Sequence, residues 1–435
     1  RLPAVPSTII ELLSHQNFAD MRLGHDPKFK FTASRALYKS ILQYICTQHN
    51  KEYVVQPLPV NNFSVRFGKK KNTLELSWQG VDDPLEPTAT PREYIVYTRI
   101  GRGGFDNGVR VSNPFHTLKI EPGIVYSFKV TAVNRGGESF PSEILAAYKS
   151  KHEKARVLII NGFDRISSPA VINTPNEAGF DLTKDPGVPY LYDISLCGSQ
   201  LNFDRKEAGK RLGESSNEYE GIKIAGNTFD YPFIHGKAIQ AIGGYSFTSC
   251  SDEAVENGSV ALEEYPIADY ILGLEKTDVN LSRATYYKTF SSSMQRALTA
   301  YCRSGGNLLV SGAYKGNREF TQNILKYRFD SSLQVSGEHI DIQGLGRILS
   351  IPRLPNERAY PVTTPDCIRP MATAFPVMTY TGGNLPAAVA YKGNDYRTFI
   401  MSFPFESIRE KAGRTAVMAS ILHFFSADNA GVHRE

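Results

Sequence analysis

The stretch Arg156-Val-Leu-Ile-Ile-Asn-Gly162 decides the fold of the largest part of this chain. Its apolar run enters a glycine turn, which is typical of a strand buried on both faces of a sheet. Further runs of this kind occur at residues 245–249, 268–276 and 307–314, and a helical pattern covers residues 291–304. Buried strands that alternate with helices predict a parallel sheet with crossover helices.

Downstream of these strands, the sequence predicts elements that complete the sheet. Residues 387–391 and 396–403 predict antiparallel additions or edge strands, and residues 414–425 predict a final helix.

A long stretch, residues 179–236, is polar and glycine-rich. Its Tyr, Phe, Asp and Asn content suits stacking on sugars and equally suits a packed loop, so both interpretations stay open.

Several polar residues fall where such a sheet forms its sites, at the carboxyl ends of strands. They are Asp164, Glu275, Ser311, and Glu406 after Ser402-Phe-Pro-Phe405. We expect these four side chains either to form a small polar pocket or to be turn and cap residues. The sequence does not decide between the two.

The layout of residues 154–425 resembles the flavodoxin-like fold of class I glutamine amidotransferases. In that family a sharp turn after one strand carries a nucleophilic Cys, and Ser311 of Val310-Ser-Gly-Ala313 takes its position here. No His follows in a comparable place, since His339 falls in a predicted loop and His423 in the last helix. A Ser without a base is a poor nucleophile, so we expect glutaminase chemistry to be absent.

Within a predicted domain of residues 55–150, residues 59–146 read as seven short strands with turn residues between them, the pattern of a β-sandwich. Trp78 lies on the second strand, and Tyr126 after Pro122-Gly123 predicts a tyrosine corner. With Leu74-Glu-Leu-Ser-Trp78 and the strand 126–134, this region resembles a fibronectin type III domain, which implies a spacer or a binding module. The charged segment 149–155 predicts a hinge after it.

Near the start of the chain, Ser7-Thr-Ile-Ile-Glu-Leu-Leu13 predicts a buried strand, and residues 32–47 predict a helix capped by Thr32 or Ser34. A carboxylate inside an apolar strand is unfavourable unless it is paired, protonated or bound to a metal. Glu11 is such a carboxylate. The local pattern equally allows a Glu at a strand end facing water.

The segment Val5-Pro-Ser-Thr-Ile-Ile-Glu-Leu-Leu-Ser-His-Gln-Asn-Phe-Ala-Asp20 and the helix after it resemble the last strand and helix of zinc-dependent N-acetylmuramoyl-L-alanine amidases. The resemblance implies that Glu11 is a catalytic residue and that Asn17 is the loop asparagine. Leu13-Ser14-His15 departs from the family's Phe-containing turn. The family's metal ligands, two His and a Glu, lie upstream of this strand, so we expect no cofactor in this chain and Zn in a full-length parent.

Composition narrows the class of protein. The chain has 435 residues, 41% hydrophobic and 21% charged, with a net charge of +5, which is typical of a globular protein and gives no basic patch for nucleic acid. No apolar run approaches the length of a membrane helix. Five Cys without a C-x-x-C pair indicate neither a disulfide framework nor a zinc ribbon, and Cys302 is expected to be a buried free thiol.

The sequence therefore predicts a multidomain α/β plus all-β protein. Its expected parts are the C-terminal strand and helix of an amidase-like domain (1–50), a β-sandwich (55–150) and a parallel-sheet, flavodoxin-like α/β domain (154–425). This order resembles exported bacterial proteins, some of which are called xanthan lyases. We expect the C-terminal part of a secreted, periplasmic or cell-surface hydrolase acting on peptidoglycan. The alternatives are a non-catalytic scaffold that binds a glycan or a partner, and a polysaccharide lyase.

Overall fold

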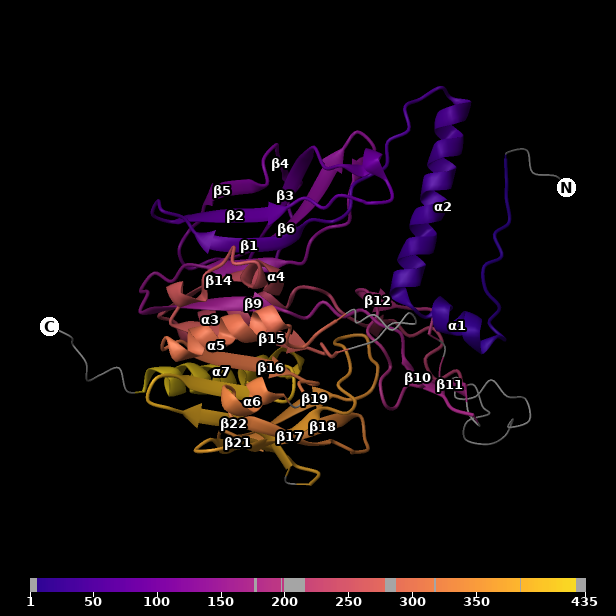
Figure 1. Ribbon diagram of the computed structural model, residues 1–435. Helices are drawn as coiled ribbons and strands as arrows, with labels where there is room; N and C mark the ends of the chain where they lie inside the picture. The colour runs from indigo at the N-terminus through magenta and orange to yellow at the C-terminus, as the bar shows by residue number, and fades with distance from the viewer. Residues whose placement is uncertain are drawn as a thin grey trace.

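The structure is a computed structural model, and it describes residues 6–175, 178–196, 198, 216–277, 287–316, 318–383 and 385–427. The centre of the molecule is a parallel sheet (Figure 1). Its strands lie in the order β14-β9-β15-β16-β23, with every neighbouring pair parallel. Their bounds are β9 (Ala155–Asn161), β14 (Tyr245–Ser251), β15 (Ile267–Gly273), β16 (Asn307–Gly312) and β23 (Arg397–Met401). The strands predicted from apolar runs are therefore present.

The sheet continues beyond β23 as antiparallel strands. They are β22 (Leu385–Lys392), β21 (Phe375–Tyr380), β18 (His339–Gly344) and β19 (Arg347–Pro352), paired in that order. The prediction for β23 was wrong in part, because this strand pairs in parallel with β16 as well as antiparallel with β22. It is thus an internal strand, which explains why Phe399, Ile400 and Met401 are all buried.

Helices cover both faces of the parallel sheet. Val157 and Ile159 of β9 pack in one hydrophobic core with α3 (Tyr231–Ile242) and α7 (Lys411–Ser426). Leu158 and Ile160 point to the other face, whose core includes α4 (Asp252–Glu256), α5 (Ser292–Arg303) and α6 (Glu319–Asn323). Alternate residues of one strand thus serve two cores, which is why its sequence is apolar throughout. The sequence did not predict α3.

Short elements complete this part of the chain. Three two-stranded sheets pair β10 (Ala170–Asn173) with β11 (Ala178–Asp181), β12 (Tyr192–Asp193) with β13 (Ile224–Ala225), and β17 (Tyr327–Ser332) with β20 (Asp366–Pro370). Single 3-10 turns are η1 (Pro87–Ala89), η3 (Leu262–Glu264) and η4 (Phe405–Ser407). Of the polar stretch 179–236, residues 199–215 lie outside the described residues.

Residues 61–148 form the predicted β-sandwich. One sheet pairs β1 (Asn61–Phe67), β2 (Thr73–Gln79) and β5 (Phe115–Lys119); the other holds β3 (Glu93–Ile100), β4 (Val109–Val111), β6 (Val125–Asn134), β7 (Gly137–Glu138) and β8 (Leu145–Tyr148). Trp78 is 3% exposed between the sheets. The tyrosine corner is confirmed, because the backbone N–H of Glu121 donates to the Tyr126 hydroxyl at 3.1 Å.

The predicted hinge at residues 149–155 was wrong. Strand β8 pairs with β6 of the sandwich and also with β14 of the central sheet. The Ser249 hydroxyl of β14 both accepts from the Ala146 N–H at 2.7 Å and donates to the Ala146 carbonyl at 2.8 Å. The Ser150 N–H donates to Ser246 at 2.9 Å. These bonds fix the polar segment to the central sheet, which the charged sequence alone did not reveal.

The prediction near the N-terminus was right for the helix and wrong for the strand. Two helices are present, α1 (Phe18–Gly24) and α2 (Pro27–Gln48), and the latter contains the predicted helix. Its N-cap is Asp26, whose carboxylate accepts from the Lys28 N–H at 2.8 Å, in place of Thr32 or Ser34. The predicted strand 7–13 is extended, largely exposed and unpaired in the described part of the chain. A strand needs a neighbour for its backbone bonds, and an apolar pattern does not supply one.

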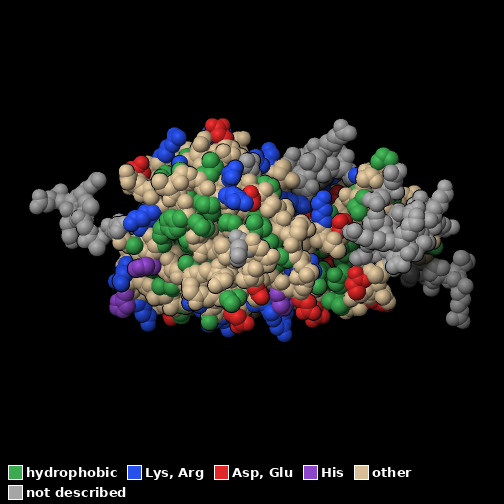
Figure 2. All heavy atoms as spheres, turned by 90° about the horizontal axis from the view of Figure 1, so that it is seen from below, with side chains coloured by type: hydrophobic (Ala, Val, Ile, Leu, Met, Phe, Trp, Pro, Cys, Tyr) green, Lys and Arg blue, Asp and Glu red, His purple; other side chains and the backbone are tan. Residues whose placement is uncertain are grey.

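The surface shows no concentration of one charge on the face seen from below, where Lys, Arg, Asp and Glu side chains are interspersed (Figure 2). Within the described residues, no helix has the length and apolar character needed to cross a membrane. Cys302 is a buried free thiol, as are Cys46, Cys250 and Cys367. Cys197 lies outside the described residues.

Candidate functional site

Two of the predicted site residues lie together beyond the carboxyl ends of β9 and β15. The Glu275 carboxylate accepts the backbone N–H groups of Asp164 at 3.1 Å and Arg165 at 2.9 Å. Burial raises the pKa of Glu275 to about 8 although these donors lower it. Glu275 therefore holds the turn that presents Asp164.

The other two candidates of the predicted polar pocket lie elsewhere. Ser311 is fully buried on β16, and its hydroxyl has no hydrogen-bond partner among the described residues. Glu406 lies in η4, where it bonds to His235 and Tyr360. The described hydrogen bonds join neither residue to Asp164 or Glu275. The structure thus places Asp164 and Glu275 together, and it places Ser311 and Glu406 elsewhere.

His235 is the buried histidine that the sequence did not reveal. It projects from α3, with Nδ1 at 2.7 Å from Asp269 of β15 and Nε2 at 3.2 Å from Glu406. Burial lowers its pKa, but the charge of Asp269 and the bonds to both carboxylates outweigh burial and raise the pKa to about 9. The His235 ring is fully buried and joins α3 to the sheet, whereas Glu406 also lines a hollow described below.

Glu11 lies on the exposed extended segment before α1 and has no hydrogen bond or ion pair within the described residues. The structure therefore does not place it in an apolar strand. Among the described residues, the group that could hold a metal ion is Asp164, Asp252 and Glu253, in another part of the molecule. Its ligands are all oxygen, unlike the two His and one Glu of the amidase family, so the described residues do not fit that zinc site.

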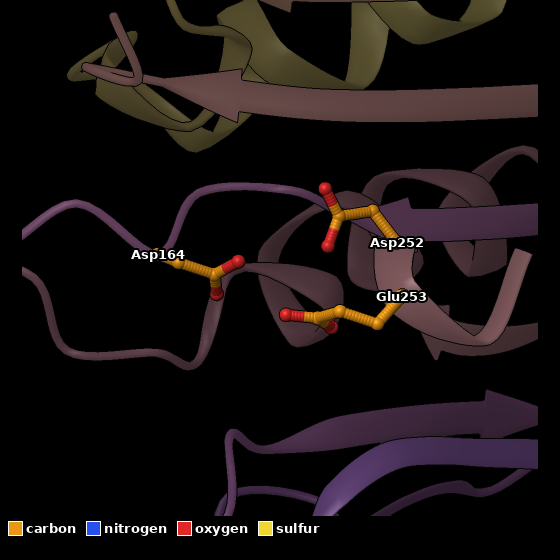
Figure 3. Close-up of side chains that lie close together, drawn as sticks. All are labelled: Asp164, Asp252 and Glu253. Atoms are coloured by element: carbon orange, nitrogen blue, oxygen red, sulfur yellow. The ribbon is translucent and has the colours of Figure 1, made fainter. Parts of the chain in front are cut away.

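Asp252 and Glu253 begin α4, directly after β14, and their carboxylates point toward Asp164 (Figure 3). One oxygen from each of the three residues lies within 4.8 Å of the others. Sequence reasoning named Asp164 but missed Asp252 and Glu253. The signal was present, since both follow a buried strand whose carboxyl end meets the same sheet edge as that of β9.

A cavity of about 570 Å³ opens beside this edge, where α2, the sandwich and the loops after β9 meet. That volume is in the range of small-ligand pockets. Its lining is rich in aromatic rings and prolines: Phe31, Phe140, Tyr190, Tyr192, Tyr287, Pro27, Pro59, Pro141, Pro169, Pro186, Pro189 and Pro361. His25, Lys28, Lys30 and Asp193 add polar groups at its wall.

Aromatic side chains remain available to a ligand at this cavity. Tyr190 and Tyr192 are 41% and 43% exposed, and the Phe31 and Phe140 rings lie 6.4 Å apart across the contact between α2 and the sandwich. The ammonium of Lys223 lies 4.0 Å from the centre of the Tyr192 ring. Exposed rings with polar neighbours offer flat apolar faces and hydrogen bonds at once.

A buried ion pair fixes one wall of the cavity. Arg165, just after β9, donates to Asp185 at 2.6 Å and to the Leu274 carbonyl at 3.1 Å, and Lys276 also bonds to Asp185. Burial opposes ionisation of Asp185, but the two cations lower its pKa to about 2. The chain segments that follow Arg165 and Asp185 supply Ile166, Ser167 and Gly187 to the cavity lining, so this wall is anchored before a ligand arrives.

A second hollow, of about 810 Å³, is more polar. Its lining includes His339, Arg358, Arg409, Tyr231 and Tyr360. Arg409 lies 2.8 Å from Nε2 of His339, and the Tyr360 hydroxyl donates to Glu406 at 2.6 Å. The structure thus gathers Tyr, His and Arg side chains that are distant in the sequence.

Comparisons with known proteins concern one part of the chain. No family model matches it, and no curated protein matches it. Similar solved structures include a myokine, at 19% identity over 22% of this chain and 100% of that one, with a TM-score of 0.19. A structure described as FN3tt mut has 16% identity over 22% of this chain and 98% of that one, with a TM-score of 0.19. The fourth FNIII domain of a human protein has 22% identity over 22% of this chain and 80% of that one, with a TM-score of 0.20. Such matches describe a fibronectin type III-like all-β region and nothing beyond that fold.

Proposed function

We propose that this chain is the C-terminal part of an exported bacterial cell-wall hydrolase, in which the described residues hold peptidoglycan and do not cut it. The observation that carries the proposal is the cavity lined by Phe31, Phe140, Tyr190 and Tyr192. Sugar rings present apolar C–H faces that pack on aromatic side chains, and their hydroxyl groups bond to polar groups at the rim.

The position of the cavity supports binding to an extended ligand. Several parts of the chain contribute to it, among them α2, the loop after β7 of the sandwich, and the loop directly after β9. Pockets of this kind prefer the boundaries between structural units. The bonds of β8 to β14 keep the sandwich in place, so the cavity does not depend on a ligand to form.

The test is binding of the 435-residue chain to soluble muropeptides and to insoluble peptidoglycan. Tyr190→Ala with Tyr192→Ala should weaken binding by about tenfold or more, since truncated aromatic anchors commonly have this effect. Tyr44→Ala is the matched control, because Tyr44 is 49% exposed on α2 and does not line the cavity. Equal affinities in all three proteins, or no binding by the wild type, would refute the proposal.

The hydrolytic half of the proposal belongs to the full-length parent. It is supported by the resemblance of residues 5–20 to zinc amidases. In the parent, Glu11→Gln should abolish cleavage of muropeptides while bound zinc, measured by atomic absorption, stays at the wild-type level. Unchanged cleavage would remove Glu11 from the mechanism.

A second candidate function, a polysaccharide lyase, is favoured by the polar hollow. A lyase needs a base over a uronic-acid ring and a cation for its carboxylate, and His339, Arg358 and Arg409 lie in one lining. Tyr360 does not suit the role of base, since burial and the neighbouring Glu406 raise its pKa well above the ordinary value. Incubation with uronic-acid polymers should give an ultraviolet-absorbing unsaturated sugar that His339→Ala abolishes. If none forms, this candidate is excluded.

A further inference from the structure

The proposed glycan cavity carries charged side chains as well as aromatic rings. His25 follows α1, Lys28 and Lys30 lie near the beginning of α2, and Asp193 belongs to β12; all four line the cavity. The rest of the lining is uncharged. Three basic side chains are therefore present with a single carboxylate. In a mostly apolar cavity, a few polar groups determine which ligand is held.

The His25 ring forms part of the cavity wall. Its centre lies 4.8 Å from that of the Phe180 ring in β11, and the two planes are inclined at 74°. This edge-to-face contact orients the imidazole. Among the residues that the structure describes, none forms a hydrogen bond with the ring nitrogens of His25. Two atoms that can bond to a ligand oxygen are therefore available in the wall.

The charges around this ring favour an anion. Burial lowers the pKa of His25, the charge of Lys30 lowers it further, and the charge of Asp193 acts in the opposite direction. The Asp193 carboxylate already accepts the N–H and the hydroxyl of Ser195, at 2.7 and 2.6 Å. Lys30 is exposed and forms no ion pair with a described residue. A negative group of a ligand would therefore find an available ammonium and an available imidazole side by side.

We propose that the cavity selects acidic glycans, with His25 and Lys30 binding a carboxylate of the ligand while its sugar rings pack on the tyrosines. This inference rests on the proposed function and names the class of ligand. Peptidoglycan fragments carry free carboxylates on their peptides, whereas chitin oligosaccharides have similar N-acetylated sugars and no charge. Hydrogen bonds between a cationic donor and a carboxylate are about twice as strong as neutral ones, so they discriminate between the two.

The experiment is a calorimetric titration of the 435-residue chain with matched ligands at about pH 7. They are a soluble muropeptide with free carboxylates, the same muropeptide with these groups amidated, and a chitin tetrasaccharide. We expect the free muropeptide to bind about tenfold or more tightly than the other two. The difference should shrink in about 1 M NaCl, where the Debye length is only about 3 Å.

A uronic acid offers the same carboxylate on the sugar ring itself, so an oligogalacturonate is the fourth ligand. Tighter binding of this ligand than of the free muropeptide would overturn the assignment to peptidoglycan. Equal affinities for the free and amidated muropeptides overturn the charge selection, yet leave the aromatic binding of the proposed function intact. No binding of any ligand removes both.

Variants separate a contact with the ligand from a structural role. His25→Gln and Lys30→Gln should each lower the affinity for the free muropeptide by about fivefold or more, and should leave that for the amidated one unchanged. Lys51→Gln is the matched control, because Lys51 is exposed just after α2 and does not line the cavity. Equal losses for both ligands would mean that the residue only supports the fold, and would contradict the inference.

The pH dependence of binding gives an independent measurement. Because its pKa is lowered, the His25 ring is neutral at about pH 7 in the free protein. A bound carboxylate favours the protonated ring and raises this pKa. The affinity for the free muropeptide should therefore rise as the pH falls from about 7.5 to about 5.5, a range in which ligand carboxylates stay ionised. His25→Gln should abolish the rise. A flat profile in the wild type excludes His25 and overturns the inference.

Discussion

At the scale of single residues, His235 shows how a buried ion group joins distant parts of the chain. Asp269 lies 34 residues from it in sequence and Glu406 lies 171 residues away. A sequence pattern can show that a histidine falls among apolar residues, but it does not identify partners so far along the chain. Asp164 was predictable because it follows a strand end, whereas its closeness to Asp252 and Glu253 depends on the order of the strands.

We predict that His235→Gln lowers the free energy of unfolding most strongly below about pH 6.5. The folded pKa of His235 is raised to about 9, so the protonated ring stabilises the fold fully below the unfolded pKa, and this contribution is lost as the pH rises through about 9. Leaving two buried carboxylates without their cation costs about 3–5 kcal/mol.

Urea denaturation at pH 6 and pH 9.5 measures this difference. The gap between wild type and variant should narrow at the higher pH. His423→Gln, an exposed change on α7, should stay within about 0.5 kcal/mol of wild type at both values. A gap that does not change with pH would mean that His235 is neutral in the folded protein.

At the scale of elements, the spacing of apolar residues and their burial determined which helices and strands could be predicted. The strands β9, β15 and β16 were predicted because burial on both faces makes their sequences apolar throughout. Helix α3 was missed because Pro232 and Gly236 interrupt its pattern and a polar stretch precedes it. Residues 7–13 have the pattern of a strand, yet pairing is a tertiary property, and the described chain offers them no partner.

Gly236 explains how α3 approaches β14, and it gives a prediction. A Cβ atom at this position would lie 2.0 Å from the Phe247 ring. Gly236→Ala should therefore lower the free energy of unfolding by about 1–3 kcal/mol, although alanine favours a helix. Gly236→Ala combined with Phe247→Leu should recover part of the loss, measured as a coupling energy in a double-mutant cycle. Additive losses would show that the two residues do not contact.

At the scale of the whole molecule, the shared strand β8 predicts cooperative unfolding. The chain has one Trp, and Trp78 lies in the core of the sandwich, so its fluorescence follows that domain alone. Far-ultraviolet circular dichroism follows every element. Because β8 belongs to both sheets, the two signals should give the same midpoint in urea.

The junction variant Ser249→Ala provides a control for this experiment. It removes both hydrogen bonds to Ala146 and should lower the midpoint seen by either signal. A Trp78 transition well separated from the circular dichroism transition in the wild type would show that the sandwich unfolds by itself.

The same strand limits how this protein can be divided or recombined. A fibronectin type III-like domain normally behaves as an exchangeable module, joined to its neighbours by a linker. Here a cut at Ser150 would leave unpaired backbone along β8 on one fragment and along β14 on the other, and open edges of this kind recruit other chains. Recombination that keeps the two parts soluble must therefore preserve the β8–β14 pairing, so we expect them to be exchanged only together.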